Sequence, residues 1–198
     1  MLHLISTAIK NRAQQPTNPG LSTSPLLRLF HEKAGVPAVC LRLNTTYGKG
    51  RDRGKTSAST AAVKAVALGH ARGEKIPFRM PYFGGENYHY VADVGAHFAS
   101  CALDPFDGFG AFNIRGETVE VEAFLRLIEK SAESLGMLSA VDLGIAPDVP
   151  SASFVCDLDD RSIQAAFPGL PRTPLETGIR LSLDTFGRMA ADGRLTAI

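Results

Sequence analysis

The apolar and polar positions of this chain follow two different periods, which together predict an α/β protein. In EVEAFLRLIEKSAESLG the apolar residues recur at helical spacing: Val121, Phe124, Leu125, Ile128 and Ala132. Gly136 follows as the expected helix end. By contrast, VPAVCLRLN (36–44) is an almost continuous apolar run, which is typical of a strand covered on both faces. A helix predicted over 24–34, with Ser24 as its N-cap, precedes this run, so the order indicates one unit of a parallel sheet.

Further helices and strands are predicted along the rest of the chain. Helices are expected at about 57–71, after a cap at Asp93, at 159–167 and at 173–191. Strands are expected at 76–83, 88–91, 110–116 and near 138–143, with GGEN (84–87) as a turn. Residues 1–24 contain several turn formers and almost no apolar periodicity, and they predict a loop or disordered lead-in.

The composition is that of an ordinary globular protein. The chain has 198 residues, 44% of them hydrophobic, 21% charged, and a formal net charge of +1. This balance gives no reason to expect nucleic acid or an acidic membrane as partner, and no apolar run reaches the length of a membrane span. Cys40, Cys101 and Cys156 are widely spaced in apolar surroundings. Free thiols in a reducing cytoplasm are the favoured interpretation, and a disulfide remains an alternative.

The basic loop GKGRDRGKT (48–56) is the segment of the chain that most suggests a binding site. It holds four cations against the single acid Asp52: Lys49, Arg51, Arg53 and Lys55. It lies just before a predicted helix, whose free amides and dipole favour an anion. The glycines miss the register of a phosphate loop. A phosphate or carboxylate site and a solvated surface loop therefore remain open.

Other candidate sites receive simpler interpretations. His89, Asp93 and His97 are four residues apart, but a strand followed by a cap should keep them off one face, and no metal site is predicted. The pair Asp159–Asp160 is better explained by a helix start than by acid–base chemistry. GxSxG, HExxH and GxGxxG motifs are absent.

Five ordered segments resemble the C-terminal half of extended short-chain dehydrogenase/reductases, the NAD-dependent epimerase/dehydratase family. GVPAVCLRLNTTYGKGR is similar to the family's G-(x)-LR-(x)-YGPGR passage, and RGKTSASTAAVKAVALG to the loop and helix after it. ENYHYVADVGAHF resembles the Y-(x)-DVA element. GAFNIRGETVEVEAF and PRTPLETGIRLSLDTFGRMAADGRL resemble the FN-(x)-G and TPL-(x)-GI endings.

The resemblance implies an incomplete Rossmann-type parallel sheet followed by a small α/β substrate-binding subdomain. The implied boundaries are a lead-in at 1–24, a remnant of the dinucleotide-binding domain at 25–57, and the substrate-binding subdomain at 58–198. It implies that Leu43, Asn44 and Thr45 approach NAD or NADP. It also implies a sugar-type substrate at a second group of residues: Tyr47, Arg51, Arg53 and Ser57.

The catalytic residues of the resembled family are missing from this chain. Its YxxxK pair, in which the Lys lowers the pKa of the Tyr, should fall near 15–21, where the sequence reads QPTNPGL. No Tyr precedes Tyr47, so no catalytic residue is assigned. The basic residue that often precedes the Y-(x)-D element is replaced by Glu86–Asn87, and DLGIAPDVPSASF lacks the arginine that commonly holds a diphosphate.

Two functions follow from these observations. The chain is expected to be the substrate-binding portion of an NAD(P)-dependent epimerase/dehydratase-type oxidoreductase, inactive alone. The alternative is a stand-alone, non-catalytic protein that covers its sheet with a second copy or a partner chain, or completes an enzyme in trans. Either way, the apolar strand at 36–44 is expected to need neighbours from outside the chain.

Overall fold

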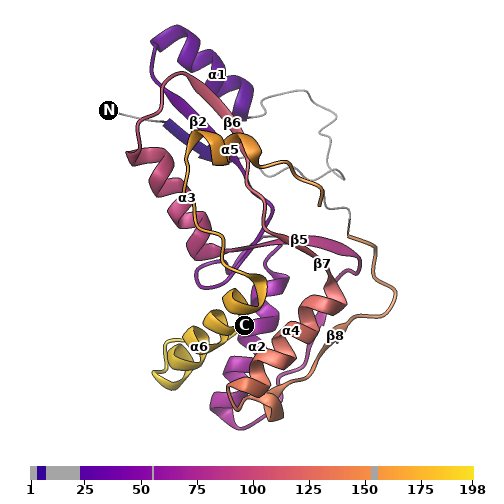
Figure 1. Ribbon diagram of the computed structural model, residues 1–198. Helices are drawn as coiled ribbons and strands as arrows, with labels where there is room; N and C mark the ends of the chain where they lie inside the picture. Colours follow the sequence, from indigo (N-terminus) through magenta and orange to yellow (C-terminus); the bar gives the residue numbers. More distant parts are fainter. Residues whose placement is uncertain (1–3, 8–22, 55, 153–155) are drawn as a thin grey trace.

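The computed structural model describes residues 4–7, 23–54, 56–152 and 156–198. Within these ranges, helices and strands alternate along an elongated molecule (Figure 1). The strands form three small sheets, with the orders β1-β2-β6, β3-β5-β7 and β4-β8. The α/β class predicted from the sequence is confirmed. None of the helices in the described ranges is both long and apolar enough to cross a bilayer.

The first sheet is parallel throughout and has helices on both faces. It joins β1 (Leu4–Thr7), β2 (Ala38–Arg42) and β6 (Phe109–Asn113). Alternate side chains of β2 face opposite sides. Cys40 meets Ser24 of α1 (Thr23–Ala34), whereas Val39 and Leu41 pack with α3 (Val91–Leu103) and α5 (Arg161–Ala166).

The neighbours of β2 come from this chain, so the expectation that they must be supplied from outside is wrong. β1 lies inside the segment predicted to be a loop, which is a second correction. The rest of that lead-in lies outside the described residues. β6 and α5 pack with the first sheet although both follow residue 57. The domain boundaries at 24 and 57 therefore stay proposals.

The second and third sheets pack around a larger core. β3 (Thr45–Tyr47) and β5 (Gly85–Tyr90) are parallel, and β7 (Glu117–Glu120) joins β5 in antiparallel register. β4 (Phe78–Met80) pairs with β8 (Leu143–Ile145). Because β5 already begins at Gly85, the predicted turn at 84–87 is wrong. The strand expected near 138–143 is instead a 3₁₀ turn (Leu138–Ala140) followed by β8.

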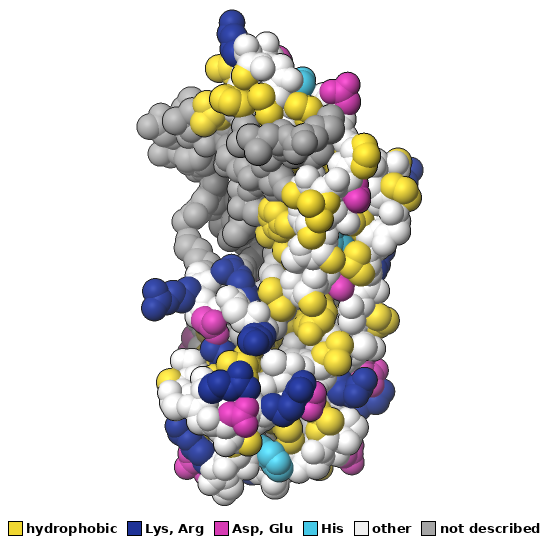
Figure 2. All heavy atoms as spheres, turned by 90° about the vertical axis from the view of Figure 1, so that its left-hand side faces the viewer, with side chains coloured by type: hydrophobic (Ala, Val, Ile, Leu, Met, Phe, Trp, Pro, Cys, Tyr) yellow, Lys and Arg dark blue, Asp and Glu magenta, His cyan; other side chains and the backbone are white. Residues whose placement is uncertain are grey.

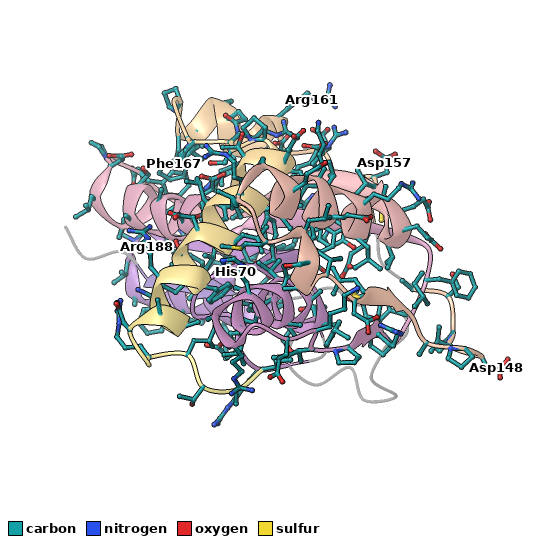
Figure 3. The ribbon with its side chains drawn as sticks, turned by 90° about the horizontal axis from the view of Figure 1, so that it is seen from below. His70, Asp148, Asp157, Arg161, Phe167 and Arg188 are labelled. Atoms are coloured by element: carbon teal, nitrogen blue, oxygen red, sulfur yellow. The ribbon has the colours of Figure 1, made fainter. Side chains whose placement is uncertain are left out.

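Three helices enclose this larger core, as the view from below shows (Figure 3). They are α2 (Ala58–Arg72), α4 (Val121–Ser134) and α6 (Leu175–Ala191), and α6 contacts both of the others. The apolar face predicted for α4 is buried here, including Phe124, whose ring stacks on Tyr88 with centroids 4.1 Å apart. Aromatic and aliphatic packing therefore hold the lower half together.

Candidate functional site

The first candidate segment lies at the carboxyl edge of the parallel sheet. β2 ends at Arg42, and Leu43 and Asn44 connect it directly to β3, which begins at Thr45. In open α/β sheets, ligands bind outside the carboxyl ends of the strands. The structure thus brings the three predicted cofactor residues to the edge where a ligand is expected. Leu43 packs against the first core, and Thr45 is buried.

Glu86 is a buried acid directly behind this segment. Its side chain is fully buried and accepts a hydrogen bond from the Thr45 hydroxyl. The Tyr82 hydroxyl lies 3.2 Å from each of its carboxylate oxygens. Burial raises the pKa of Glu86, and the hydroxyl groups around it oppose that rise. The hydroxyl proton of Thr45 is therefore directed toward Glu86, and this residue helps to fix the start of β3.

The position of Glu86 could not be read from the sequence. The sequence shows Glu86 only as a replacement for a basic residue, and the turn predicted at 84–87 would expose it. Strand alternation gives one signal, because Glu86 and Tyr88 fall on the same side of β5 once that strand is extended back to Gly85.

Tyr47 lies in the interior, and its hydroxyl does not reach the rim of a site. Its side chain is 1% exposed, and its hydroxyl donates to the carbonyl oxygen of Leu175 at 3.2 Å. The ring meets Phe124 edge-on, with centroids 5.7 Å apart. Burial raises the pKa of the hydroxyl far above its usual value. Tyr47 thus ties β3 to the first residue of α6, behind the basic loop.

The basic loop divides its charges between structure and surface. The Arg51 guanidinium donates to the carbonyl oxygen of Arg53 at 2.5 Å and to the Thr56 hydroxyl at 2.8 Å, so it braces the loop from inside. Lys49 and Arg53 are exposed, whereas Asp52 forms an ion pair with the mostly buried Lys64. Lys55 lies outside the described residues.

Lys64 is a contributor that the sequence did not reveal. It neutralises the single acid of the loop, and its ammonium group lies 5.7 Å from the centroid of the Phe186 ring. Because Asp52 is paired in this way, the exposed charge of the described part of the loop is positive. Figure 2 shows many Lys and Arg side chains on the lower half of the molecule.

Ser57 lies at the start of α2, but its side chain does not cap the helix. Its hydroxyl donates instead to the carbonyl oxygen of Gly54 at 2.8 Å. Gly48 begins the loop with φ 115°, and a Cβ there would lie 2.8 Å from Cγ1 of Val91. The loop therefore needs glycine at this turn. It brings Arg51, Arg53 and Ser57 together, whereas Tyr47 lies in the core behind them.

His89 and His97 lie together, contrary to the sequence expectation. Their rings meet edge-on with centroids 5.2 Å apart, because α3 folds back over β5. Asp93 lies in the first turn of α3 and is not its cap, and its carboxylate accepts hydrogen bonds from the backbone amide and hydroxyl of Thr173. Burial, with His97 and Arg172 nearby, lowers the pKa of His89 to about 4. No group of three or more His, Cys, Asp or Glu side chains that could hold a metal ion occurs among the described residues.

The remaining candidates are structural. The thiols of Cys40 and Cys101 are buried, whereas that of Cys156 is only partly buried. Asp160 lies at the N-cap position of α5 without a side-chain cap, and Asp159 forms an exposed ion pair with Arg161. Arg161 lowers the pKa of Asp159 to about 2. This geometry is that of a surface ion pair.

The fold defined by this sheet and its helices is a partial Rossmann-like α/β fold. The solved structures that resemble it include nucleotide-sugar epimerases and a dehydratase, some of them in complex with NAD. UDP-glucose 4-epimerase of Thermus thermophilus, in complex with NAD, has a TM-score of 0.65 and 19% identity, over 93% of this chain and 64% of that one. No protein-family profile and no curated protein sequence matches the chain.

Two further structures show the same likeness. UDP-N-acetylglucosamine 4-epimerase of Methanobrevibacter ruminantium, in complex with UDP-N-acetylmuramic acid, has a TM-score of 0.66 and 15% identity, over 94% of this chain and 63% of that one. dTDP-glucose 4,6-dehydratase of Bacillus anthracis, in complex with NAD, has a TM-score of 0.57 and 12% identity, over 94% and 61%. The chain thus spans less than two thirds of the length of these neighbours.

Proposed function

We propose that the chain supplies the substrate-binding portion, and one edge of the cofactor site, of an NAD(P)-dependent epimerase/dehydratase-type oxidoreductase. The observation that carries the proposal is the junction of β2 and β3, where Leu43, Asn44 and Thr45 lie at the carboxyl edge of the parallel sheet. The solved structures with the same fold support it. The substrate would be a sugar or a nucleotide sugar.

The residues at this edge fit one part of a nicotinamide dinucleotide. Leu43 is an apolar residue suited to lie against a ring, and Asn44 brings an amide. Thr45, whose hydroxyl hydrogen is held by Glu86, can only accept from a ligand. The cofactor, NAD or NADP, would supply hydride transfer when bound. The catalytic Tyr and Lys and the Gly-rich turn are assigned to another portion, so the chain alone is expected to be inactive.

The basic loop would receive the substrate. Arg53 is exposed and available for a phosphate or carboxylate, while Arg51 keeps the loop in shape. The hydroxyl of Ser57 lies in the same loop. Tyr47 would act from behind, by fixing β3 against α6. In this assignment Arg53 contributes affinity and Arg51 contributes order.

A binding experiment tests the assignment of Arg53. Calorimetric titration with UDP-glucose is expected to show binding that Arg53→Gln weakens about tenfold, as the loss of a hydrogen bond between charged groups implies. Arg194→Gln is the matched control, because Arg194 is an exposed arginine paired with Asp192 near the C-terminus. The substrate assignment would be refuted if Arg53→Gln and Arg194→Gln bound UDP-glucose with equal affinity, or if neither variant bound it.

One observation favours the alternative, a non-catalytic binding or assembly partner. The outer face of α1 exposes three large apolar side chains: Leu26, Leu29 and Phe30 at 53%, 50% and 46%. In Figure 2 apolar side chains gather at the upper end, where α1 lies in Figure 1. Such a surface suits a second copy or a partner chain. Tight complex formation without any response to NAD or UDP-sugars would favour this second function.

A further inference from the structure

A groove between α4 and β8 plays no part in the proposed function. It has a volume of about 580 Å³, and nine residues line it: Glu122, Leu125, Arg126, Glu129, Val141, Asp142, Leu143, Gly144 and Ile145. A volume of this size accommodates a small ligand or a few residues of a peptide. The loop that follows β8 and carries Asp148 projects away from the helices (Figure 3).

One wall of the groove is the unpaired edge of β8. In the parallel pair with β4, Phe78 donates to the carbonyl oxygen of Asp142, and Ala146 donates to that of Met80. This register turns the backbone groups of Gly144 toward β4. The amides and carbonyls of Leu143 and Ile145 consequently point to the opposite edge. No strand within the described ranges pairs with that edge, and an open edge is a template for another strand.

The other wall combines an apolar floor with charged positions on α4. Leu125, Leu143 and Ile145 belong to the larger core or pack against it. Glu122, Arg126 and Glu129 are spaced by four and three residues, so they lie along one face of the helix. Within the described ranges, neither glutamate has a hydrogen-bond or ion-pair partner. Asp142, in contrast, is held by Arg79 at 2.7 Å.

We propose that this groove binds an extended segment of another polypeptide, which adds a strand to the free edge of β8. Its backbone would pair with Leu143 and Ile145. Its alternate apolar side chains would cover the floor, and a Lys or Arg would meet Glu122 or Glu129. The edge requires an extended backbone, because a helix has no free groups along its side to pair with a strand. The two unpaired acids outnumber Arg126, which lies between them on this face of α4, so they favour basic residues in the bound segment.

A selection from phage-displayed random dodecapeptides tests the proposal, with the full chain as bait. The expected result is an enriched pattern of alternating apolar residues with Lys or Arg. The affinity of a synthetic consensus peptide is then measured by fluorescence polarisation. N-methylation of the peptide at alternate residues should weaken binding at least about fivefold in one register and leave it unchanged in the other, because only one set of amides faces β8.

Two variants of the protein locate the bound peptide. Ile145→Pro removes an amide that points away from β4, so the β4–β8 pair should persist while peptide binding falls at least about fivefold. The double charge reversal E122K/E129K should weaken a basic peptide to a similar extent. Glu133→Lys is the control, since Glu133 is an exposed acid of α4 outside the groove lining. The affinity of Glu133→Lys for the peptide should match that of the unsubstituted protein.

Several outcomes would overturn the proposal. These are enrichment of no sequence, enrichment of a helical pattern, or binding that N-methylation in either register leaves intact. Equal loss in Glu133→Lys and E122K/E129K would also overturn it. If Ile145→Pro fails to fold by circular dichroism, the N-methylated peptides still decide the question with the unsubstituted protein. Binding of UDP-glucose is not involved in any of these measurements, so failure here is distinct from failure of the proposed function.

Discussion

Removal of the His89 side chain should abolish part of the acid sensitivity of the protein. His89 is 3% exposed, and its Nδ1 atom is buried without a hydrogen-bond partner in the described structure. The groups around it are His97 and Asp93 of α3 and Arg172, which precedes α6. Burial, together with His97 and Arg172, outweighs Asp93 and lowers the pKa of His89 to about 4, from 6.5.

The sign and size of the effect follow from proton linkage. Between pH 6.5 and 4 the unfolded chain binds a proton at His89 that the folded protein does not, so stability falls as pH falls through this window. Each pH unit costs about 1.4 kcal/mol, so the full loss is about 3 kcal/mol. Above pH 6.5 and below pH 4 the contribution of His89 is flat.

Urea unfolding followed by circular dichroism between pH 4 and 8 measures this effect, since the chain has no tryptophan for fluorescence. His89→Leu keeps an apolar side chain at the site and removes the titration. Relative to the unsubstituted protein, the free energy of unfolding of His89→Leu should be about 3 kcal/mol higher at pH 4 than it is at pH 7. His70→Gln removes an exposed histidine of α2 as a control (Figure 3). Parallel stability curves for the unsubstituted protein and His89→Leu would refute the reasoning.

Substitutions at three other positions, each compared with a second variant or a second pH, test the packing and charge around β5. Glu86→Gln should raise the free energy of unfolding near pH 8, and this gain should vanish toward acidic pH. The reason is that the pKa of Glu86 is raised, so its buried charge costs stability only where the carboxyl group is ionised. Urea unfolding at both pH values measures the difference between variant and unsubstituted protein, and an equal difference at both would contradict the prediction. Gly116→Ala should cost about 3 kcal/mol or prevent folding, because its Cβ would overlap the carbonyl oxygen of Tyr88. Gly95→Ala is the control, since a Cβ there meets no atom within 4 Å and its backbone, like that of Gly116, is not left-handed; equal losses would contradict the steric argument. Phe124→Ala should lower the free energy of unfolding by about 3–5 kcal/mol and Phe124→Leu by clearly less, since the buried ring stacks on Tyr88. Thermal unfolding compares the two variants, and equal midpoints would show that the stack contributes little.

Strong local patterns made part of the fold predictable from sequence. The helix at Val121–Ser134 and the strand at Ala38–Arg42 were found because a regular apolar face and a continuous apolar run each allow few conformations. The strand Glu117–Glu120 was missed because its residues are polar and mostly exposed. Its extended form depends on pairing with β5, which is a tertiary contact that local sequence does not encode.

The candidate site was predictable only in its chain segments. The basic loop and the residues after β2 could be located, since charge density and strand ends are visible in the sequence. The partners of their side chains could not, because Glu86, Lys64 and Leu175 come from other elements. For the same reason the contact between His89 and His97 was missed, as it arises only when α3 folds back over β5.

The short connections between the first two sheets have a mechanical consequence. β2 passes into β3 through two residues, Leu43 and Asn44, and β6 passes into β7 through residues 114–116, where Gly116 packs against the Tyr88 backbone. Any bending of one half of the molecule against the other must rotate these few backbone bonds. A ligand bound at residues 43–45 would therefore stiffen the connection that it occupies. The two halves of the molecule should then move less against each other when the ligand is bound.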